Sequence, residues 1–270
     1  MTRISQAATR LGDLLVAPFG DHAAWALAVG AAVFGAVAIM LFKLATPQRR
    51  LAAARNRLVG RLLEAAIYQT SLRTLLAVQG DLLKANLRYL VLALPAIAAL
   101  VLPLVLVLPQ LESRFGRRPL EVGEAVLVTA QVTDAAAGWR LEAPAALEVE
   151  AGPVHDAARG ELVWRVRALA PGRHELAITR GGDSQQLAVP VAAPGLPAIA
   201  AARYRNGLEQ VLLDPSEAAL PPAADVARFA AAMPARRFAV LGVTAPWLVG
   251  FTVLSLLAGL LLRKPLRVEL

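Results

Sequence analysis

Hydrophobic residues gather in three stretches of the chain that contain no charged side chain: 23–42, 89–111 and 238–262. A helix needs about 20 apolar residues to cross the roughly 30 Å hydrocarbon core of a bilayer, so each stretch is long enough. Lipid offers the backbone no hydrogen-bond partner, and segments that cross it are therefore helical. The pattern predicts three transmembrane helices, at 23–43, 89–111 and 237–262.

The segment between the first two stretches, 44–88, has apolar residues at every third or fourth position, which is typical of packed helices. One such seam consists of Leu58, Leu62, Ala65, Leu72, Leu76 and Leu83. The sequence therefore predicts an amphipathic helical arm. Two interpretations stay open: a hairpin that packs on itself and on the membrane surface, or a docking arm for a partner. Gly80 marks either the turn of that hairpin or a glycine tolerated within a helix.

After Pro119 the period of the apolar positions falls from 3.6 to 2, which indicates β-strands. About seven short strands, separated by turn residues such as Gly181-Gly182, fit the segment 112–193. This number and spacing of strands is typical of an antiparallel β-sandwich.

Two stretches of this segment resemble bacterial immunoglobulin-like domains: VGEAVLVTAQV at 122–132 and LAPGRHELAIT at 169–179. The resemblance implies an immunoglobulin-like β-sandwich that serves as a structural or binding module, with no catalytic residues. It implies no particular ligand, because sandwiches host many roles.

The remaining segments have weaker patterns. Apolar residues at helical spacing within 1–22 predict a short interfacial helix at the N-terminus. Alanine and proline dominate 194–236, which predicts a semi-rigid linker with short helices. The last residues, 263–270, form a basic tail.

Charge is divided unevenly along the chain, whose formal net charge is +8. From Lys43 to Arg88 the chain carries nine basic residues against two acidic ones, whereas 112–228 carries 12 arginines against 15 acidic residues. Basic residues beside membrane helices stay on the cytoplasmic side. The arm and the tail are therefore predicted to lie inside, and the N-terminus and the sandwich outside, in a multi-pass protein of the bacterial inner membrane. No RNA- or DNA-binding motif accompanies the charge, so direct nucleic-acid recognition is not expected.

The arginines of the arm are the candidate partner-binding residues, because they would be exposed beside the membrane. They are Arg49, Arg50, Arg55, Arg57, Arg61 and Arg73.

The sequence predicts no catalytic, cofactor-binding or metal site. The chain has no cysteine, and its three histidines fall in different regions without metal-ligand spacing. The stretches 23–42, 89–111 and 238–262 contain no Asp, Glu, Lys, Arg or His, which argues against a pump, transporter or channel. Residues that could shape a groove or allow close helix packing are Pro95, Pro103, Thr244, Thr252 and Ser255.

The stretch LLKANLRYLVLALPAIAALVLPLVL, at 82–106, joins the helical arm directly to a proline-containing span. Together with an outward N-terminus, a basic cytoplasmic arm and an inward C-terminus, this layout resembles the YidC/Oxa/EMC-type membrane insertase superfamily. The resemblance implies a membrane-protein chaperone whose arm receives ribosomes or nascent chains.

The sequence thus predicts an α+β membrane protein with three transmembrane helices, a cytoplasmic helical arm and an extracytoplasmic immunoglobulin-like β-sandwich. The predicted function is non-enzymatic: a scaffold or a subunit of a membrane complex, whose partners are the lipid bilayer and other subunits. The alternative is the insertase-like chaperone, with a ribosome or a nascent chain as its partner.

Overall fold

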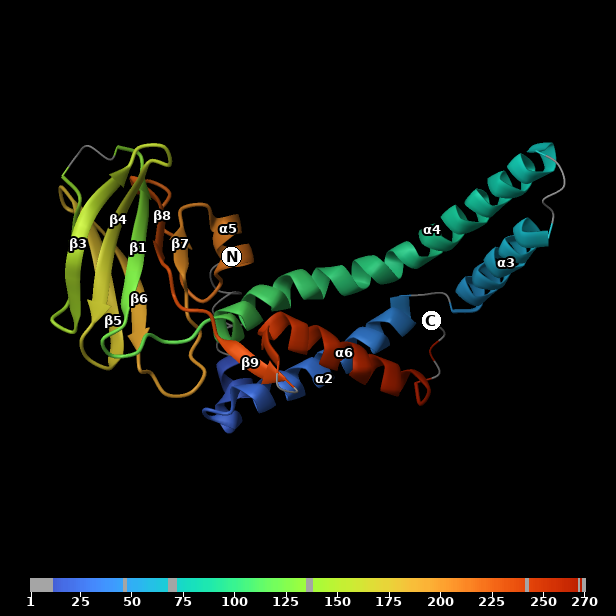
Figure 1. Ribbon diagram of the computed structural model, residues 1–270, viewed down its shortest axis with the longest axis horizontal. Helices are drawn as coiled ribbons and strands as arrows, with labels where there is room; N and C mark the ends of the chain where they lie inside the picture. Colours follow the sequence, from blue (N-terminus) through green and yellow to red (C-terminus); the bar gives the residue numbers. More distant parts are fainter. Residues whose placement is uncertain are drawn as a thin grey trace. The chain divides into compact units, whose positions relative to one another are not determined.

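The structure is a computed structural model of the 270-residue chain. It describes residues 12–45, 48–67, 72–134, 138–240, 243–266 and 268. Helices are combined with antiparallel sheets, which confirms the predicted α+β class (Figure 1). The chain divides into two compact units: Met1–Leu27 with Val105–Gly250 form unit 1, and Ala28–Leu104 with Phe251–Leu270 form unit 2. Half of the N-terminal segment 1–22, for which an interfacial helix was predicted, lies outside the described residues.

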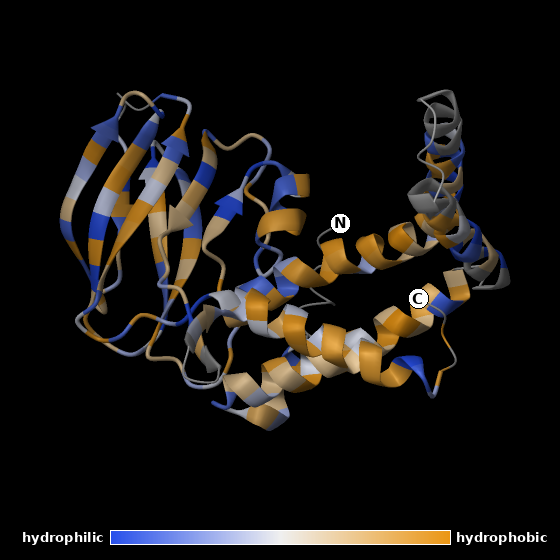
Figure 2. Ribbon diagram, turned by 45° about the vertical axis from the view of Figure 1, so that its right-hand side comes forward, coloured by the Kyte–Doolittle hydropathy of each residue, from blue (hydrophilic) through white to orange (hydrophobic). Residues whose placement is uncertain are grey.

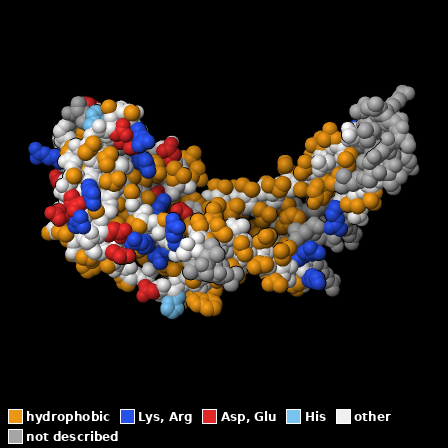
Figure 3. Space-filling model, viewed as in Figure 1, with side chains coloured by type: hydrophobic (Ala, Val, Ile, Leu, Met, Phe, Trp, Pro, Cys, Tyr) orange, Lys and Arg blue, Asp and Glu red, His pale blue; other side chains and the backbone are white. Residues whose placement is uncertain are grey.

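Three helices carry the apolar stretches: α2 (Ala23–Ala45), α4 (Leu72–Leu111) and α6 (Trp247–Arg263). Among the described residues, Ala23–Ala45 and Gln79–Gly116 are long and apolar enough to cross a membrane, and α6 is a shorter apolar helix of 17 residues. The hydropathy colouring of Figure 2 follows this distribution. On the face drawn in Figure 3, hydrophobic side chains cover the helices, whereas charged side chains of both signs are scattered over the sheets.

The arm consists of two helices, α3 (Gln48–Ile67) and the first half of α4. Gly80 lies inside α4, so it is a tolerated helical glycine and not the turn of a hairpin. α4 continues without a break from the arm into the second predicted span, and both Pro95 and Pro103 lie within it.

The strands of the described residues form three antiparallel sheets, two of which lie in the sandwich. Within 112–193 there are six strands, β1 to β6, where about seven were predicted. The larger sheet has the order β3 (Leu147–Asp156), β4 (Glu161–Ala168), β1 (Ala125–Val132), β8 (Val226–Ala231), β7 (Ala202–Tyr204). The smaller sheet has the order β2 (Arg140–Glu142), β5 (Gly172–Arg180), β6 (Asp183–Val191).

The two sheets share one hydrophobic core, which makes them a β-sandwich. Alternate residues of β1 are buried, as a strand with one face on a core requires. Val128 and Val166 of the larger sheet lie in the same buried cluster as Ile178 and Val189 of the smaller one, and all four are completely buried. Burial of one such side chain contributes about 1.5–3 kcal/mol to folding.

The segment 194–236 is not the linker that its composition predicted. It supplies β7, the short helix α5 (Gly207–Leu213) and β8, and β8 lies inside the larger sheet between β1 and β7. The sequence of β8, VARFAA, favours a helix locally because it is rich in alanine. Pairing with two neighbouring strands and complete burial of Phe229 override that preference.

The helix in the third predicted span, 237–262, is shorter than the prediction. Within this span, β9 (Arg237–Val240) pairs antiparallel with β10 (Val243–Pro246), and the helix α6 begins only at Trp247. A short apolar run can be a strand or a helix, and hydrophobicity alone does not separate the two. Pro246 stands just before the helix, where its missing N–H costs no helical hydrogen bond.

Within unit 2, α2 and α6 pack closely at Gly35. A Cβ atom at this position would overlap the backbone carbonyl oxygen of Ser255 and lie 3.0 Å from the Cβ of Ala258. The rings of Phe34 and Phe251 are in contact beside this point, with centroids 5.3 Å apart. The helix contact therefore depends on a residue without a side chain, as in other closely packed apolar helices.

We expect Gly35→Ala to weaken this contact, because backbone atoms of α6 cannot yield as a flexible side chain could. Overpacking of this kind costs about 1–3 kcal/mol. Thermal unfolding of the purified full-length protein in detergent measures the effect. Gly30→Ala, at a glycine of the same helix with open space around it, is the matched control. Equal melting temperatures for the two variants would contradict the proposed packing role.

Candidate functional site

The predicted partner-binding arginines of the arm fall into two groups. Arg50, Arg55 and Arg57 have described side chains and belong to α3, whereas the side chains of Arg49, Arg61 and Arg73 lie outside the described residues. Among the three that are described, Arg57 lines the cavity between α3 and α4, and the other two are not part of its lining.

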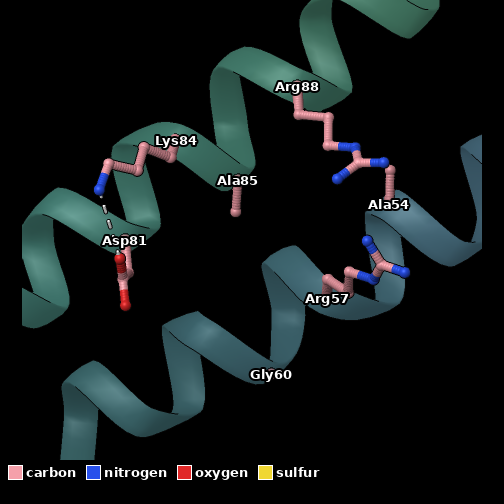
Figure 4. A pocket seen from close by; sticks show the side chains of 7 residues that line it. All are labelled: Ala54, Arg57, Gly60, Asp81, Lys84, Ala85 and Arg88. Carbon is pink, nitrogen blue, oxygen red and sulfur yellow. Dashed lines mark ion pairs between the residues drawn. The ribbon is translucent and has the colours of Figure 1, made fainter.

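This cavity, the arm cleft, lies between α3 and α4 within unit 2 and has a volume of about 650 Å³ (Figure 4). Its walls are formed by Ala54, Arg57 and Gly60 of α3 and by Asp81, Lys84, Ala85 and Arg88 of α4. Three of these seven residues are Ala or Gly, and their small size leaves the space open.

The charges around the arm cleft are unbalanced. Figure 4 shows the side chains of Arg57 and Arg88 entering the cleft from opposite helices, beside Ala54. Neither guanidinium forms an ion pair within the described part of the chain. Lys84 is 3.8 Å from the carboxylate of Asp81, one turn away on α4. Three cations therefore share the cleft with one carboxylate.

Lys84 and Arg88 were counted in the charge of the arm but were not among the predicted partner-binding residues. Their spacing of four places them on one face of α4, and Asp81 and Ala85 share that face. The sequence does not indicate which face of α3 lies opposite, so the pairing of Arg57 with Arg88 comes from the tertiary structure.

The residues predicted to shape a groove or to pack the spans lie in different places. Thr244 belongs to β10 and not to a span, so the prediction for it is wrong. Ser255 takes part in close packing through its carbonyl at Gly35, and its hydroxyl donates to the carbonyl of Thr252 at 3.1 Å. Pro95 is exposed and Pro103 half-buried on α4, and none of the five lines the arm cleft.

A second group of functional interest was not predicted, and it joins the sandwich to the helix ends within unit 1. We call it the stem: residues 112–118, which follow α4, together with 234–236, which precede β9. The N–H of Arg118 donates to the carbonyl of Pro234, and the N–H of Arg236 donates to the carbonyl of Gly116, each at 2.9 Å. The chain that leaves α4 is thereby paired with the chain that returns to α6.

Side chains of the stem also bind the first residue of α6 and the segment that precedes α2. The indole N–H of Trp247, the first residue of α6, donates to the Glu112 carboxylate at 2.6 Å. Arg114 is 2% exposed and lies 2.5 Å from Asp13, in the segment before α2. The neighbouring Phe115 is buried against the ring of Phe238.

The stem is linked to the sandwich by an ion pair between Arg117 and the buried Asp214, with a distance of 2.9 Å. The same carboxylate accepts hydrogen bonds from the N–H groups of Ala201 and Ala202. Burial raises the pKa of Asp214 from 3.8 to about 6, against the opposing effect of Arg117. The buried carboxylate of Asp214 thus connects the end of α5, the stem and the start of β7. Burial makes the charged form of this carboxylate unfavourable.

Within the described residues, no group of three or more His, Cys, Asp or Glu side chains could hold a metal ion. A scan against protein-family models, a search of curated proteins and a search of solved structures give no match to this chain. The resemblances to immunoglobulin-like domains and to the insertase superfamily therefore stay predictions.

The titration of Asp214 should make the sandwich less stable as the pH rises. Its carboxyl group has a pKa of about 6 when folded and 3.8 when unfolded, so the folded state holds the additional proton between these values. The stability from this proton is fully present below about pH 3.8 and is lost as the pH rises through about 6. Asp214→Asn removes the titration. Its free energy of opening should gain on the wild type by about 2 kcal/mol between pH 4 and pH 7, as linkage gives for these two pKa values.

Hydrogen exchange of the β1 and β8 amides in the full-length protein measures this difference. Burial also raises the pKa of Glu217, so only the comparison of variant and wild type isolates Asp214. Asp183→Asn, at the exposed first residue of β6, is the control for loss of one carboxylate. A constant difference between Asp214→Asn and wild type over this pH range would show that Asp214 does not titrate there.

Proposed function

We propose that this protein crosses the bacterial inner membrane three times, through α2, α4 and α6, and holds its β-sandwich outside the cytoplasm as a scaffold or a subunit of a membrane complex. The observation that carries the proposal is the stem. Within unit 1 its short polar contacts connect the sandwich, the chain that follows α4, the first residue of α6 and the segment that precedes α2. Such contacts are needed to hold a domain in a set position, whereas a flexible tether would not require them.

The exposure of α4 supports a membrane environment. Only 6% of its most apolar window is buried, so it is not the core helix of a soluble domain. Leu94 and Leu102 are 62% and 70% exposed. Exposed leucine surface of this extent is unfavourable in water, at about 25 cal/mol per Å², and this cost disappears in lipid.

The distribution of charge supports the orientation. Unit 2 contains 12 basic and three acidic residues, a net charge of +9, and unit 1 contains 16 basic and 17 acidic residues, a net charge of −1. The starts of α2 and α6 and the end of α4 belong to unit 1, while their other ends belong to unit 2. This alternation is what three consecutive spans require, and the positive-inside rule favours the cytoplasm for the ends in unit 2.

The short helix α5 supports a partner-binding role for the sandwich. Its polar Gln210 is buried and bonded to the backbone of Tyr204 and Asp214, whereas Leu208 and Leu212 are 56% and 37% exposed. The helix is therefore fixed with an apolar face outward. Exposed apolar patches on a folded domain are typical of protein interfaces, and we propose that another subunit of the complex covers this one.

The orientation predicts the behaviour of fusions to a reporter enzyme that is active only outside the cytoplasm. A fusion after Gly181, in the turn between β5 and β6, should be active. A fusion after Arg57, in the arm, should be inactive although it is expressed. The reverse pattern would place the sandwich in the cytoplasm and overturn the orientation.

If another subunit covers α5, it should no longer co-purify with the protein when the exposed face of α5 is made polar. In Leu208→Asp/Leu212→Asp, a subunit that co-purifies stoichiometrically with the tagged full-length protein should be lost, because two charges would be buried at the interface. Val149→Asp/Val154→Asp changes two residues of β3 that are 37% and 63% exposed, and it should retain the subunit. Equal retention in both variants, or no stoichiometric subunit in the wild type, would contradict the partner surface on α5.

The insertase-like function stays an alternative prediction. The hydroxyl of Ser255 is bonded within its own helix. The helical residues 23–42, 89–111 and 247–262, proposed as spans, carry no charged side chain that could line a hydrophilic groove. Depletion of the protein, followed by measurement of the insertion of small membrane proteins, tests this alternative, and unchanged insertion would exclude it.

A further inference from the structure

Two guanidinium groups line the arm cleft, and the one carboxylate among the described residues of its wall, that of Asp81, is paired with Lys84. Arg57 comes from α3 and Arg88 from α4, and Figure 4 shows both directed into the same space. Two like charges held in this way repel each other unless an anion lies between them. The planar guanidinium group binds phosphate through paired N–H donors, so two arginines from opposite walls suit a phosphate group well.

The position of these arginines along α4 indicates the source of the phosphate. Arg88 directly precedes Tyr89, the first residue of the uncharged stretch 89–111. If α4 spans the membrane as proposed, Arg88 lies at the depth of the lipid headgroups, with Lys84 one turn farther toward the cytoplasm. Basic pockets between helices on the cytoplasmic side of a membrane bind the headgroups of anionic lipids.

The face of α4 that continues from Arg88 toward the uncharged stretch is apolar. Val91 and Pro95 follow Arg88 at helical spacing and are exposed, Val91 by 61%. An acyl chain could lie along them while its headgroup occupies the cleft. A free phosphate ion or an acidic peptide would leave this apolar continuation without a partner.

We propose that the arm cleft binds the phosphate headgroup of an anionic phospholipid, held between Arg57 and Arg88, with an acyl chain along α4. The small residues Ala54, Gly60 and Ala85 provide the space for the headgroup. This inference goes beyond the scaffold function and rests only on the part of it in which α4 crosses the membrane. The lipid would neutralise the repulsion between α3 and α4 and so fix the two helices of the arm beside the bilayer.

Lipid retention by the purified full-length protein in detergent, followed by native mass spectrometry, tests the proposal with phosphatidylglycerol as the probe. Arg57→Gln/Arg88→Gln should bind this lipid about 30-fold more weakly, since each of the two basic residues near the headgroup contributes roughly 1 kcal/mol. Arg50→Gln/Arg263→Gln removes the same charge at two exposed arginines outside the cleft and should bind it as the wild type does. Ala85→Phe keeps every charge but fills the cleft, and it should also lower retention.

Competitors distinguish the possible occupants. Neither an excess of inorganic phosphate nor an excess of phosphatidylcholine should displace bound phosphatidylglycerol. Displacement by inorganic phosphate alone would mean that the cleft binds the free anion. Displacement by a soluble glutamate-rich peptide would mean that it binds an acidic protein segment. Either result would overturn the proposal for a lipid, as would equal retention by the two double variants.

Carbonate extraction of membranes separates this inference from the proposed function. Protein that stays in the membrane, combined with equal lipid binding in both double variants, would overturn the lipid site alone. Protein released by carbonate would overturn the spanning helices and the lipid site together. Retention in the membrane with selective loss of lipid in Arg57→Gln/Arg88→Gln is the expected result.

Discussion

The ion pair between Arg117 and Asp214 is the contact on which the arrangement of unit 1 depends. Arg117 lies six residues after the end of α4, and Asp214 directly follows α5. The pair therefore joins the stem to the segment between β7 and β8 of the sandwich. A buried ion pair seldom adds net stability over apolar packing, because both charges lose their hydration. Its value is geometric: the bonds of Asp214 to Arg117 and to two backbone N–H groups allow few alternative positions for α5 and β7.

The chemistry of the chain lies at the ends of its apolar helices and not within them. The uncharged stretches carry no Asp, Glu, Lys, Arg or His, whereas Glu112, Arg114 and Arg117 gather after α4, and Lys84 and Arg88 lie on α4 before its uncharged stretch. Charged groups are tolerated where water, lipid headgroups or buried partners are available. Both the scaffold proposal and the lipid-binding proposal place their contacts at these helix ends.

Sequence patterns identified elements where local and tertiary preferences agree. The strands β1 to β6 were predicted, because alternating residues or short apolar runs are separated there by turn signals. β8 was not, because its alanine-rich sequence favours a helix, and only pairing with β1 and β7 makes it a strand. The hairpin before Trp247 was likewise included in a span, since hydrophobicity alone does not indicate whether an apolar run is a strand or a helix. Of the candidate arm residues, Arg57 lines the arm cleft. That Arg88 lies opposite it depends on how α3 and α4 pack, which the sequence does not indicate.

The sequence by itself determined the α+β class, the apolar stretches, the strands of 112–193 and the concentration of positive charge in the arm and tail. Each of these follows from composition or from a period of two or 3.6, which are local properties of the chain. Only the tertiary structure decided that 194–236 completes the sandwich, that Gly35 allows α2 and α6 to touch, and that Arg57 faces Arg88. These contacts join residues far apart in the sequence, and their energies exist only once the chain has folded and brought those residues together.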